Sequence, residues 1–257
     1  MALIRIDHVP ETVKVNLPLY IILPNPGEMS GIPVRERKVL YLLHGLSDDG
    51  SAWQRYTSIE RTAANYGLVV VMPSAGRSFY TDQPNGQNYF SYLIEELPAY
   101  LSDVFGLAPR REDTLIAGNS MGGYGAFKAA FLHPERFFAA ASFSGALSLE
   151  FVRHNPHDPR ITEFSHLFGD IQKLSGSPYD PAVWFQNAAR NLSALPRLYM
   201  SCGRMDDLYP VNRFVHAALQ NLGIDVDYYE EDAYHDWTFW DVQIKRFLAS
   251  VLGNPPA

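Results

Sequence analysis

One serine of this chain stands where it could act as a nucleophile. Ser120 is the central residue of GNSMG at positions 118–122, which fits the pattern G-x-S-x-G. The apolar run before it predicts a buried strand, and the run after it predicts a helix. A serine at such a turn is exposed by a strained backbone, provided that its neighbours two positions away are small. Because the pattern arises by chance about one time in ten in such a chain, its meaning depends on the rest of the sequence.

A serine hydroxyl is a weak nucleophile unless a base removes its proton. In the strand-turn-helix arrangement an acid and then a histidine follow the serine, each after a later strand. Asp206 follows the seventh predicted strand, and His235 follows the eighth. The adjacent Asp207 is an alternative acid, because neighbouring side chains point in different directions and only one can meet the histidine. Asp232 and Asp236 are weaker alternatives, and Asp236 is more simply the N-cap of the last helix.

Acyl transfer also needs donors that stabilise an oxyanion. One predicted donor is the backbone N–H of Met121, the residue after the serine. The other is the N–H of Leu46, in the loop that follows the third predicted strand, where His44-Gly45 permits a tight turn. The same loop can be interpreted as an ordinary strand-to-helix turn with capping residues, and the two interpretations are compatible.

Short apolar runs alternate with helical patterns, which predicts a single α/β domain over residues 1–257. Several runs are apolar throughout, as is typical of parallel strands covered on both faces. The first two strands are expected to pair antiparallel, since the link between them is short. Strands are predicted at Leu3–His8, Val13–Leu23, Val39–His44, Leu68–Pro73, Thr114–Gly118, Phe137–Phe143, Arg197–Cys202 and Val226–Glu231. Helices are predicted at Ser51–Tyr66, Ser91–Phe105 with a kink or break at Pro98, Met121–Leu132, Val211–Leu222 and Trp237–Leu252.

One segment departs from this alternation. Residues 144–193 contain no clear strand, and a structureless span of that length is unusual in a compact domain. The segment is rich in aromatic residues, among them Trp184. We expect residues 147–191, called the cap segment below, to form short helices over one end of the sheet. The alternative is an ordinary side layer of the core.

Composition restricts the classes of partner. The chain has 257 residues, a formal net charge of −7 and no basic run, which argues against nucleic acid. Its apolar runs are too short to span a membrane, and its start does not resemble a signal peptide. The single cysteine, Cys202, excludes an intrachain disulfide and is expected to be buried. These features predict a cytoplasmic protein.

No cofactor is predicted. The histidines His154, His157 and His166, with Asp158, do not match a known metal-ligand spacing, so no metal site is predicted either.

Four stretches together resemble the esterase D or tributyrin-esterase branch of the α/β-hydrolases. They are YLLHGLSDDGSAW, AGNSMGGYGAFKAAFLHPERF, CGRMDDLYPVN and YHDWTFW, and the resemblance runs from about Leu3 to Leu252. That branch includes S-formylglutathione hydrolases, short-chain acyl esterases, acetyl-xylan and feruloyl esterases, and mycolyltransferases. The resemblance implies the α/β-hydrolase fold, with an eight-stranded, mostly parallel sheet and helices on both faces.

The resemblance also implies roles for individual residues. It makes Ser120 the nucleophile, His235 the base and Asp206 the acid, because the family's acid comes four residues after the cysteine of a Cys-Gly pair. It makes Leu46 and Met121 the oxyanion donors, and it matches Trp53 to an aromatic position near the entrance of the site. The residues that we predict to contact the substrate are His44, Gly45, Trp53, Trp184 and Trp237.

The predicted function is that of a serine carboxylesterase acting on short-chain acyl esters of the acetyl type. The substrate would be a small-molecule or carbohydrate ester. Alternatives within the class are a feruloyl or cinnamoyl esterase and an S-formylglutathione hydrolase. Alternatives outside it are an acyltransferase and a non-catalytic binding protein. The sequence leaves the oligomeric state open, with a homo-oligomer as one alternative.

Overall fold

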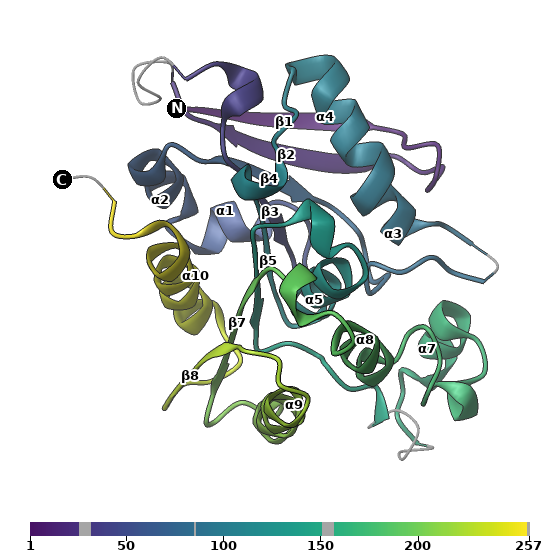
Figure 1. Ribbon diagram of the computed structural model, residues 1–257. Coiled ribbons are helices and arrows are strands. Elements are labelled where there is room, and N and C mark those ends of the chain that lie inside the picture. The colour runs from purple at the N-terminus through teal and green to yellow at the C-terminus, as the bar shows by residue number, and fades with distance from the viewer. Residues whose placement is uncertain (26–31, 85, 151–156, 256–257) are drawn as a thin grey trace.

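The computed structural model describes residues 1–25, 32–84, 86–150 and 157–255. Within them, one sheet of eight strands has the order β1-β2-β4-β3-β5-β6-β7-β8 (Figure 1). Its strands are β1 (Ala2–His8), β2 (Leu17–Leu23), β3 (Val39–Leu43), β4 (Val69–Pro73), β5 (Thr114–Asn119), β6 (Ala139–Phe143), β7 (Arg197–Gly203) and β8 (Asp227–Glu231). Strand β2 pairs antiparallel with β1 and β4, and all other pairs are parallel. The predicted mostly parallel sheet is confirmed.

The strands at the centre of the sheet are buried on both faces. Every residue of β3, β4, β5 and β6 is buried. The edge strands β1 and β8 are largely exposed or half-buried. This is the pattern expected of parallel strands covered by helices, and it explains why the central runs of sequence are apolar without alternation.

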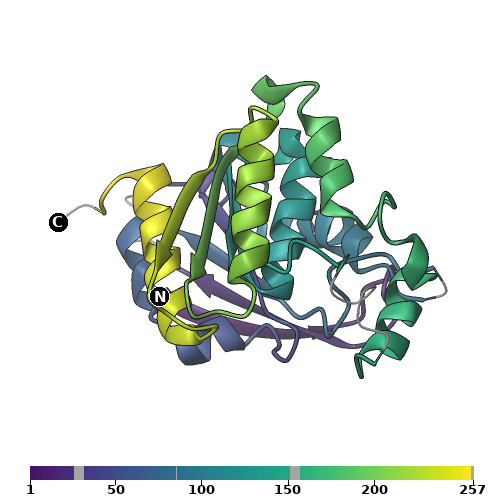
Figure 2. The same cartoon turned by 90° about the horizontal axis from the view of Figure 1, so that it is seen from below.

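Helices cover the sheet on both sides (Figures 1 and 2). One side carries α1 (Ala52–Tyr56), α2 (Ile59–Tyr66) and α10 (Trp237–Leu252). The other carries α3 (Tyr89–Ser91), the π-helix η3 (Tyr92–Glu96), α4 (Leu97–Phe105), α5 (Met121–Leu132), α7 (Ile161–Phe168), α8 (Pro181–Ala188) and α9 (Tyr209–Asn221). The 3-10 turns are η2 (Val34–Glu36), η4 (Arg111–Asp113), η5 (Pro134–Arg136), η6 (Ile171–Lys173) and η7 (Leu192–Ala194). In the described parts of the chain, no helix has the length and hydropathy of a membrane span.

Two predicted helices differ from the observed ones. The helix expected over residues 51–66 is split, because Thr57 is extended (φ −131°, ψ 176°) between α1 and α2. The stretch Ser51-x-x-Gln54 matches a capping box in sequence, but Ser51 makes no capping hydrogen bond and Gln54 donates to Glu60 instead. Helical structure runs from residue 89 to residue 105 through the π-helix, with Pro98 in the first turn of α4. Pro98 has no N–H to donate to the carbonyl of Ile94 four residues earlier, and that carbonyl accepts from Arg136 instead.

The cap segment packs its aromatic residues into the main core. Trp184 of α8 lies edge-on to Tyr124 of α5, with ring centroids 5.0 Å apart, and Phe164 of α7 lies 5.4 Å from Phe79. Helix α8 therefore forms part of the layer that covers the sheet beside α5 (Figure 2). Residues 151–156, with His154, lie outside the described residues. A cap over the end of the sheet stays a prediction.

Asp241 of α10 holds the start of α2. One carboxylate oxygen accepts hydrogen bonds from the backbone N–H and the hydroxyl of Ser58 at 2.8 and 2.9 Å, and the other accepts from Lys245 at 2.6 Å. Burial alone would raise the pKa of Asp241. The bonds from Lys245 and Ser58 lower it by more, so the pKa lies below its usual value. The stabilisation is therefore present above the unfolded-state pKa and lost as the pH falls through the folded-state pKa.

We expect Asp241→Ala to lower the free energy of unfolding by about 1–2 kcal/mol at pH 7. The difference from wild type should shrink below about pH 4. Urea denaturation at several pH values measures both. Asp241→Asn, which keeps an acceptor without the charge, should lose less. A difference from wild type that is the same at pH 3 and pH 7 would contradict this account.

Candidate active site

Ser120 occupies a strained turn between β5 and α5. Its φ of 53° and ψ of −116° are rare for a residue other than glycine. Its N–H donates to the carbonyl of Phe143 at 2.9 Å, and its carbonyl accepts from the N–H of Ala146 at 3.1 Å. Both bonds come from the end of β6 and the loop after it. The turn is therefore fixed by the neighbouring strand as well as by α5.

The two glycines around Ser120 are required by close backbone contacts. A Cβ on Gly118 would lie 2.4 Å from the carbonyl carbon of Gly122, and a Cβ on Gly122 would lie 2.3 Å from the carbonyl oxygen of Leu43. The end of β5, the start of α5 and the end of β3 thus meet through their main chains. This contact also brings the loop after β3 beside the serine, since a Cβ on Gly45 would lie 3.6 Å from the Cβ of Ser120.

His235 and Asp206 are brought together by two loops that bond to each other. The N–H of Arg204 donates to the carbonyl of Glu231 at 2.8 Å, and that of Met205 donates to Ala233 at 3.0 Å. Nδ1 of His235 lies 2.7 Å from Oδ2 of Asp206. Because an ionised carboxylate only accepts, Nδ1 carries the hydrogen and Nε2 carries the lone pair.

Asp206, and not Asp207, meets the histidine. The Asp206 side chain is fully buried, while Asp207 is exposed. Burial raises the pKa of Asp206, but the hydrogen bond and charge of His235 and the N–H of Leu208 lower it more, so the carboxyl stays ionised at neutral pH. Asp232 is bound to Arg204, and Asp236 caps α10 by accepting from Phe239, as expected of an N-cap.

Two residues of this surrounding were not predicted from the sequence. Trp240 lies edge-on to the His235 ring at 4.9 Å, and its Nε1 donates to the hydroxyl of Ser144 at 3.1 Å. Ser144, in turn, hydrogen-bonds Asp206. Trp240 is the second tryptophan of YHDWTFW and lies one helical turn after Asp236. This spacing is the sequence signal that could have placed it beside His235. Ser144 carries no sequence signal, because its role follows from a positive φ of 48° after β6.

His44 holds the loop after β3 and does not reach the substrate, so the predicted contact through its side chain is wrong. The side chain is fully buried. The N–H of Ala75 donates to Nε2 at 2.9 Å, which leaves Nδ1 to donate to the carbonyl of Gly45 at 2.7 Å. Burial lowers the pKa of His44 to about 4, so the ring is neutral. Since a trans peptide is planar, fixing the Gly45 carbonyl directs the N–H of Leu46 the opposite way.

The two predicted oxyanion donors therefore lie in the loop beside Ser120 and at the start of α5. The N–H of Met121 is among the first four of α5, which have no acceptor within the helix. Leu46 follows Gly45, whose backbone lies against Ser120. Arg77 also approaches this loop, donating to the carbonyl of Leu46 at 3.5 Å while it pairs with Glu163 of α7. This pair links α7 to the loop that carries Leu46.

Two of the three tryptophans predicted to bind substrate lie in the core, which contradicts that prediction. Trp53 is fully buried and donates to the carbonyl of Leu43 at 2.9 Å. Trp184 is 1% exposed and donates to Pro178 at 2.7 Å. Trp237 is partly exposed and stacks on Tyr56, so its contact with substrate stays a prediction. The same holds for Gly45.

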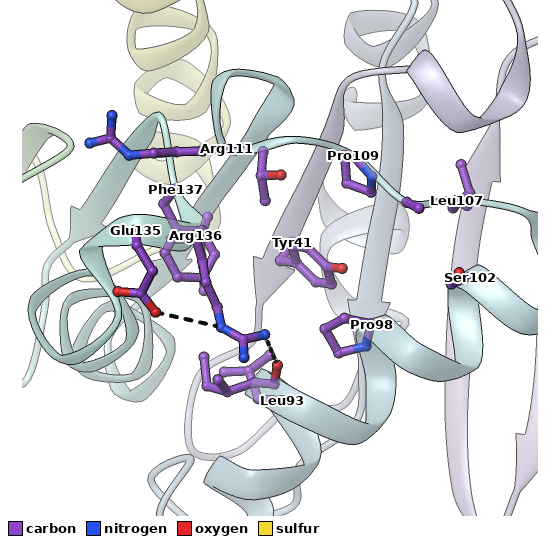
Figure 3. A pocket seen from close by; sticks show the side chains of 14 residues that line it. Tyr41, Leu93, Pro98, Ser102, Leu107, Pro109, Arg111, Glu135, Arg136 and Phe137 are labelled. Atoms are coloured by element: carbon purple, nitrogen blue, oxygen red, sulfur yellow. Dashed lines mark hydrogen bonds and ion pairs between the residues drawn. The ribbon is translucent and has the colours of Figure 1, made fainter.

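A separate pocket of about 360 Å³ opens at the other end of the sheet (Figure 3). Its lining includes Thr114, which begins β5, whereas Ser120 follows the end of that strand. Arg136 in its wall donates to the carbonyl of Ile94 and lies 3.9 Å from Glu135. This pocket is therefore distinct from the surroundings of Ser120.

The sheet, the serine turn and the histidine–aspartate pair in this chain order define the class of the α/β-hydrolases. Comparison with known proteins agrees. The chain belongs to the family described as Esterase, whose model matches residues 11–251. It is thus a carboxylic ester hydrolase.

Individual relatives cover nearly all of the chain. A curated acetyl esterase of Caldicellulosiruptor saccharolyticus is 32% identical over 254 residues, which are 95% of this chain and 96% of that protein. Two solved structures from Staphylococcus aureus are each 30% identical and cover 98% of both chains. They are the fluorophosphonate-binding serine hydrolase FphF, with a TM-score of 0.89, and the S-formylglutathione hydrolase FrmB, with a TM-score of 0.86.

The backbone contact at Gly122 makes a direct prediction. We expect Gly122→Ala to lower the free energy of unfolding by about 3 kcal/mol or more, because the new methyl group would overlap the β3 main chain. Urea denaturation measures the change. Gly176→Ala is the matched control: its φ is +75° but nothing lies within 4 Å of the added Cβ, so only the left-handed backbone is penalised, by about 1 kcal/mol. Equal losses in the two variants would contradict the close contact.

Proposed function

We propose that the protein is a serine carboxylesterase that hydrolyses short-chain acyl esters through Ser120, His235 and Asp206. The observation that carries the proposal is the 2.7 Å bond between His235 Nδ1 and Asp206 Oδ2. The loops that form it follow the carboxyl ends of β7 and β8, and the strained Ser120 turn follows the carboxyl end of β5. This bond sets the tautomer that leaves Nε2 able to accept a proton.

In the acylation step, His235 Nε2 takes the hydroxyl proton of Ser120 as the serine oxygen attacks the ester carbonyl. The buried carboxylate of Asp206 stabilises the resulting imidazolium. The backbone N–H groups of Leu46 and Met121 donate to the oxyanion, and their positions are fixed before the substrate arrives. His235 then protonates the leaving alcohol.

In the deacylation step, water replaces the alcohol and loses its proton to His235 as it attacks the acyl-enzyme. Collapse of the second tetrahedral intermediate returns the proton to Ser120 and releases the acid. Each chemical step uses only groups of this chain, the substrate and water.

Several observations favour a small acyl group over an aromatic one. Trp53 and Trp184, which were predicted to contact the substrate, lie in the core and offer no stacking surface to a feruloyl ring. The relative with the acetyl esterase name covers nearly the whole chain.

The alcohol part of the substrate is a separate question. The ion pair of Arg77 and Glu163 beside Leu46, which carries no net charge, offers hydrogen bonds to an uncharged polar alcohol such as a sugar.

A second candidate is an S-formylglutathione hydrolase. The similarity to the Staphylococcus aureus enzyme of that name over 98% of both chains favours it. A formyl group is the smallest acyl group, so the same restriction on acyl size would admit it.

The triad is tested by three single variants. We expect Ser120→Ala to lower kcat on the order of 10⁶-fold and Asp206→Asn on the order of 10⁴-fold, because they remove the nucleophile and the group that orients the base. Asp207→Asn, an exposed control, should stay within about threefold of wild type. Assay with 4-nitrophenyl acetate gives kcat, and a fluorophosphonate probe should label wild type and Asp207→Asn but not Ser120→Ala. Equal labelling of Ser120→Ala, or a larger loss in Asp207→Asn than in Asp206→Asn, would refute the assignment.

Acyl preference is tested with a panel of esters. We expect kcat/KM to be at least about tenfold higher for 4-nitrophenyl acetate than for the octanoate, with the butyrate between them. Acetylated xylo-oligosaccharide, S-formylglutathione and methyl ferulate then separate the three candidate substrates. A preference for octanoate would exclude a short-chain esterase, and methyl ferulate as the best natural-type substrate would overturn the argument from the buried tryptophans.

A further inference from the structure

A buried lysine on α5 takes no part in the mechanism above. Lys128 lies two turns after Ser120 on this helix and is only 5% exposed. Its Nζ donates to the hydroxyl of Thr81 at 2.6 Å and to the carbonyl of Tyr80 at 3.3 Å, and it lies 4.2 Å from the centre of the Phe90 ring. Lysine is rarely buried without a specific partner. Its two hydrogen-bond partners, Tyr80 and Thr81, are consecutive residues of one turn.

The carboxylate whose charge acts on this lysine, Asp82, does not form an ion pair with it. Asp82 contributes charge at a distance, but its Oδ1 accepts from the N–H groups of Phe90 and Ser91 at 2.9 and 3.0 Å, and its Oδ2 accepts from the Ser91 hydroxyl at 2.8 Å. The ring of Tyr179 lies 6.0 Å away. Burial lowers the pKa of Lys128 to about 7. Its burial is therefore offset mainly by the bonds to Tyr80 and Thr81.

The turn that Lys128 contacts is strained. Phe79 and Tyr80 are consecutive residues with φ of 51° and 47°, a backbone region that side chains other than glycine rarely adopt. Tyr80 also packs directly on α5, since a Cβ on Gly125 would lie 2.6 Å from its ring. Such a conformation persists only where its surroundings hold it.

Tyr80 connects this turn to the loop after β3. Its hydroxyl accepts from the N–H of His44 at 2.9 Å and donates to the carbonyl of His44 at 3.2 Å. His44 in turn holds the carbonyl of Gly45, which directs the N–H of Leu46. A continuous set of bonds therefore runs from α5 to the proposed oxyanion donor.

We propose that Lys128 is a positioning residue for the oxyanion loop: it holds the turn at Phe79 and Tyr80 so that the Tyr80 hydroxyl keeps His44, and with it the Leu46 N–H, in place. The inference rests on the proposed function, because Leu46 matters only if an oxyanion forms at Ser120. It goes beyond that function because Lys128 does not touch the reacting atoms, yet its loss would displace the Leu46 N–H.

Two variants, Lys128→Met and Tyr80→Phe, remove opposite ends of this connection. We expect each to lower kcat/KM for 4-nitrophenyl acetate by about 10- to 100-fold, somewhat less than deletion of a donor, with KM within threefold of wild type. The inhibition constant of propylboronic acid, whose adduct with the serine is a tetrahedral boronate with one oxygen in the oxyanion position, should rise by the same factor. The double variant should lose less than the product of the two single losses, because both residues act on one loop.

Tyr124→Phe is the matched control. Tyr124 is a fully buried tyrosine on the same helix, and its hydroxyl donates to the carbonyl of Tyr179 at 2.7 Å, away from the oxyanion loop. It should lower the melting temperature while leaving kcat/KM and boronate inhibition within twofold of wild type. If Tyr124→Phe changes both as much as Lys128→Met does, general loosening of the core explains the loss and the proposal is wrong.

The outcomes separate this inference from the proposed function. Absence of hydrolysis and of fluorophosphonate labelling in wild type would refute the proposed function itself. An active wild type, with Lys128→Met and Tyr80→Phe both within twofold of it in kcat/KM and boronate inhibition, would refute only the role of Lys128. Should Lys128→Met not fold, Thr81→Val takes its place, since it removes the hydroxyl to which Lys128 donates; activity and boronate inhibition within twofold of wild type would then refute the role of Lys128.

Discussion

The site depends on one constraint, which is the close contact of three backbone segments around Gly118 and Gly122. The ends of β5 and β3 and the start of α5 approach so closely that no Cβ fits between them. This approach forces Ser120 into a positive φ, and it also brings Gly45 beside the serine. Nucleophile and oxyanion loop are therefore positioned by one packing contact.

The parallel strands bring the histidine and the aspartate to the same end of the sheet as the serine. Residues that follow the carboxyl ends of β7 and β8 must lie near those that follow β5, because all three strands run in one direction. The backbone bonds between the two loops then bring His235 within 2.7 Å of Asp206. The sheet brings the loops of the three residues close together, and the backbone bonds between two of these loops bring His235 and Asp206 to hydrogen-bonding distance.

The parts that could be predicted from the sequence are those with local causes. Buried strands and α5 follow from apolar runs, and the order of Ser120, Asp206 and His235 follows from strand order. The break at Thr57 was missed because Asp241, far along the chain, caps α2. Trp53 was misassigned because an aromatic residue near a site in sequence can turn its ring into the core. The Tyr80 clamp on His44 joins residues 36 positions apart and has no local pattern.

The neutral ring of His44 has a consequence for the protein in acid. Both nitrogens are committed, one as donor to Gly45 and one as acceptor from Ala75, so a second proton would have to replace the bond from Ala75. Between about pH 6.5 and pH 4 the unfolded chain binds a proton at this imidazole and the folded chain does not. Mild acid therefore lowers the stability of the folded state, and the cost falls on the residue that holds the loop carrying Leu46.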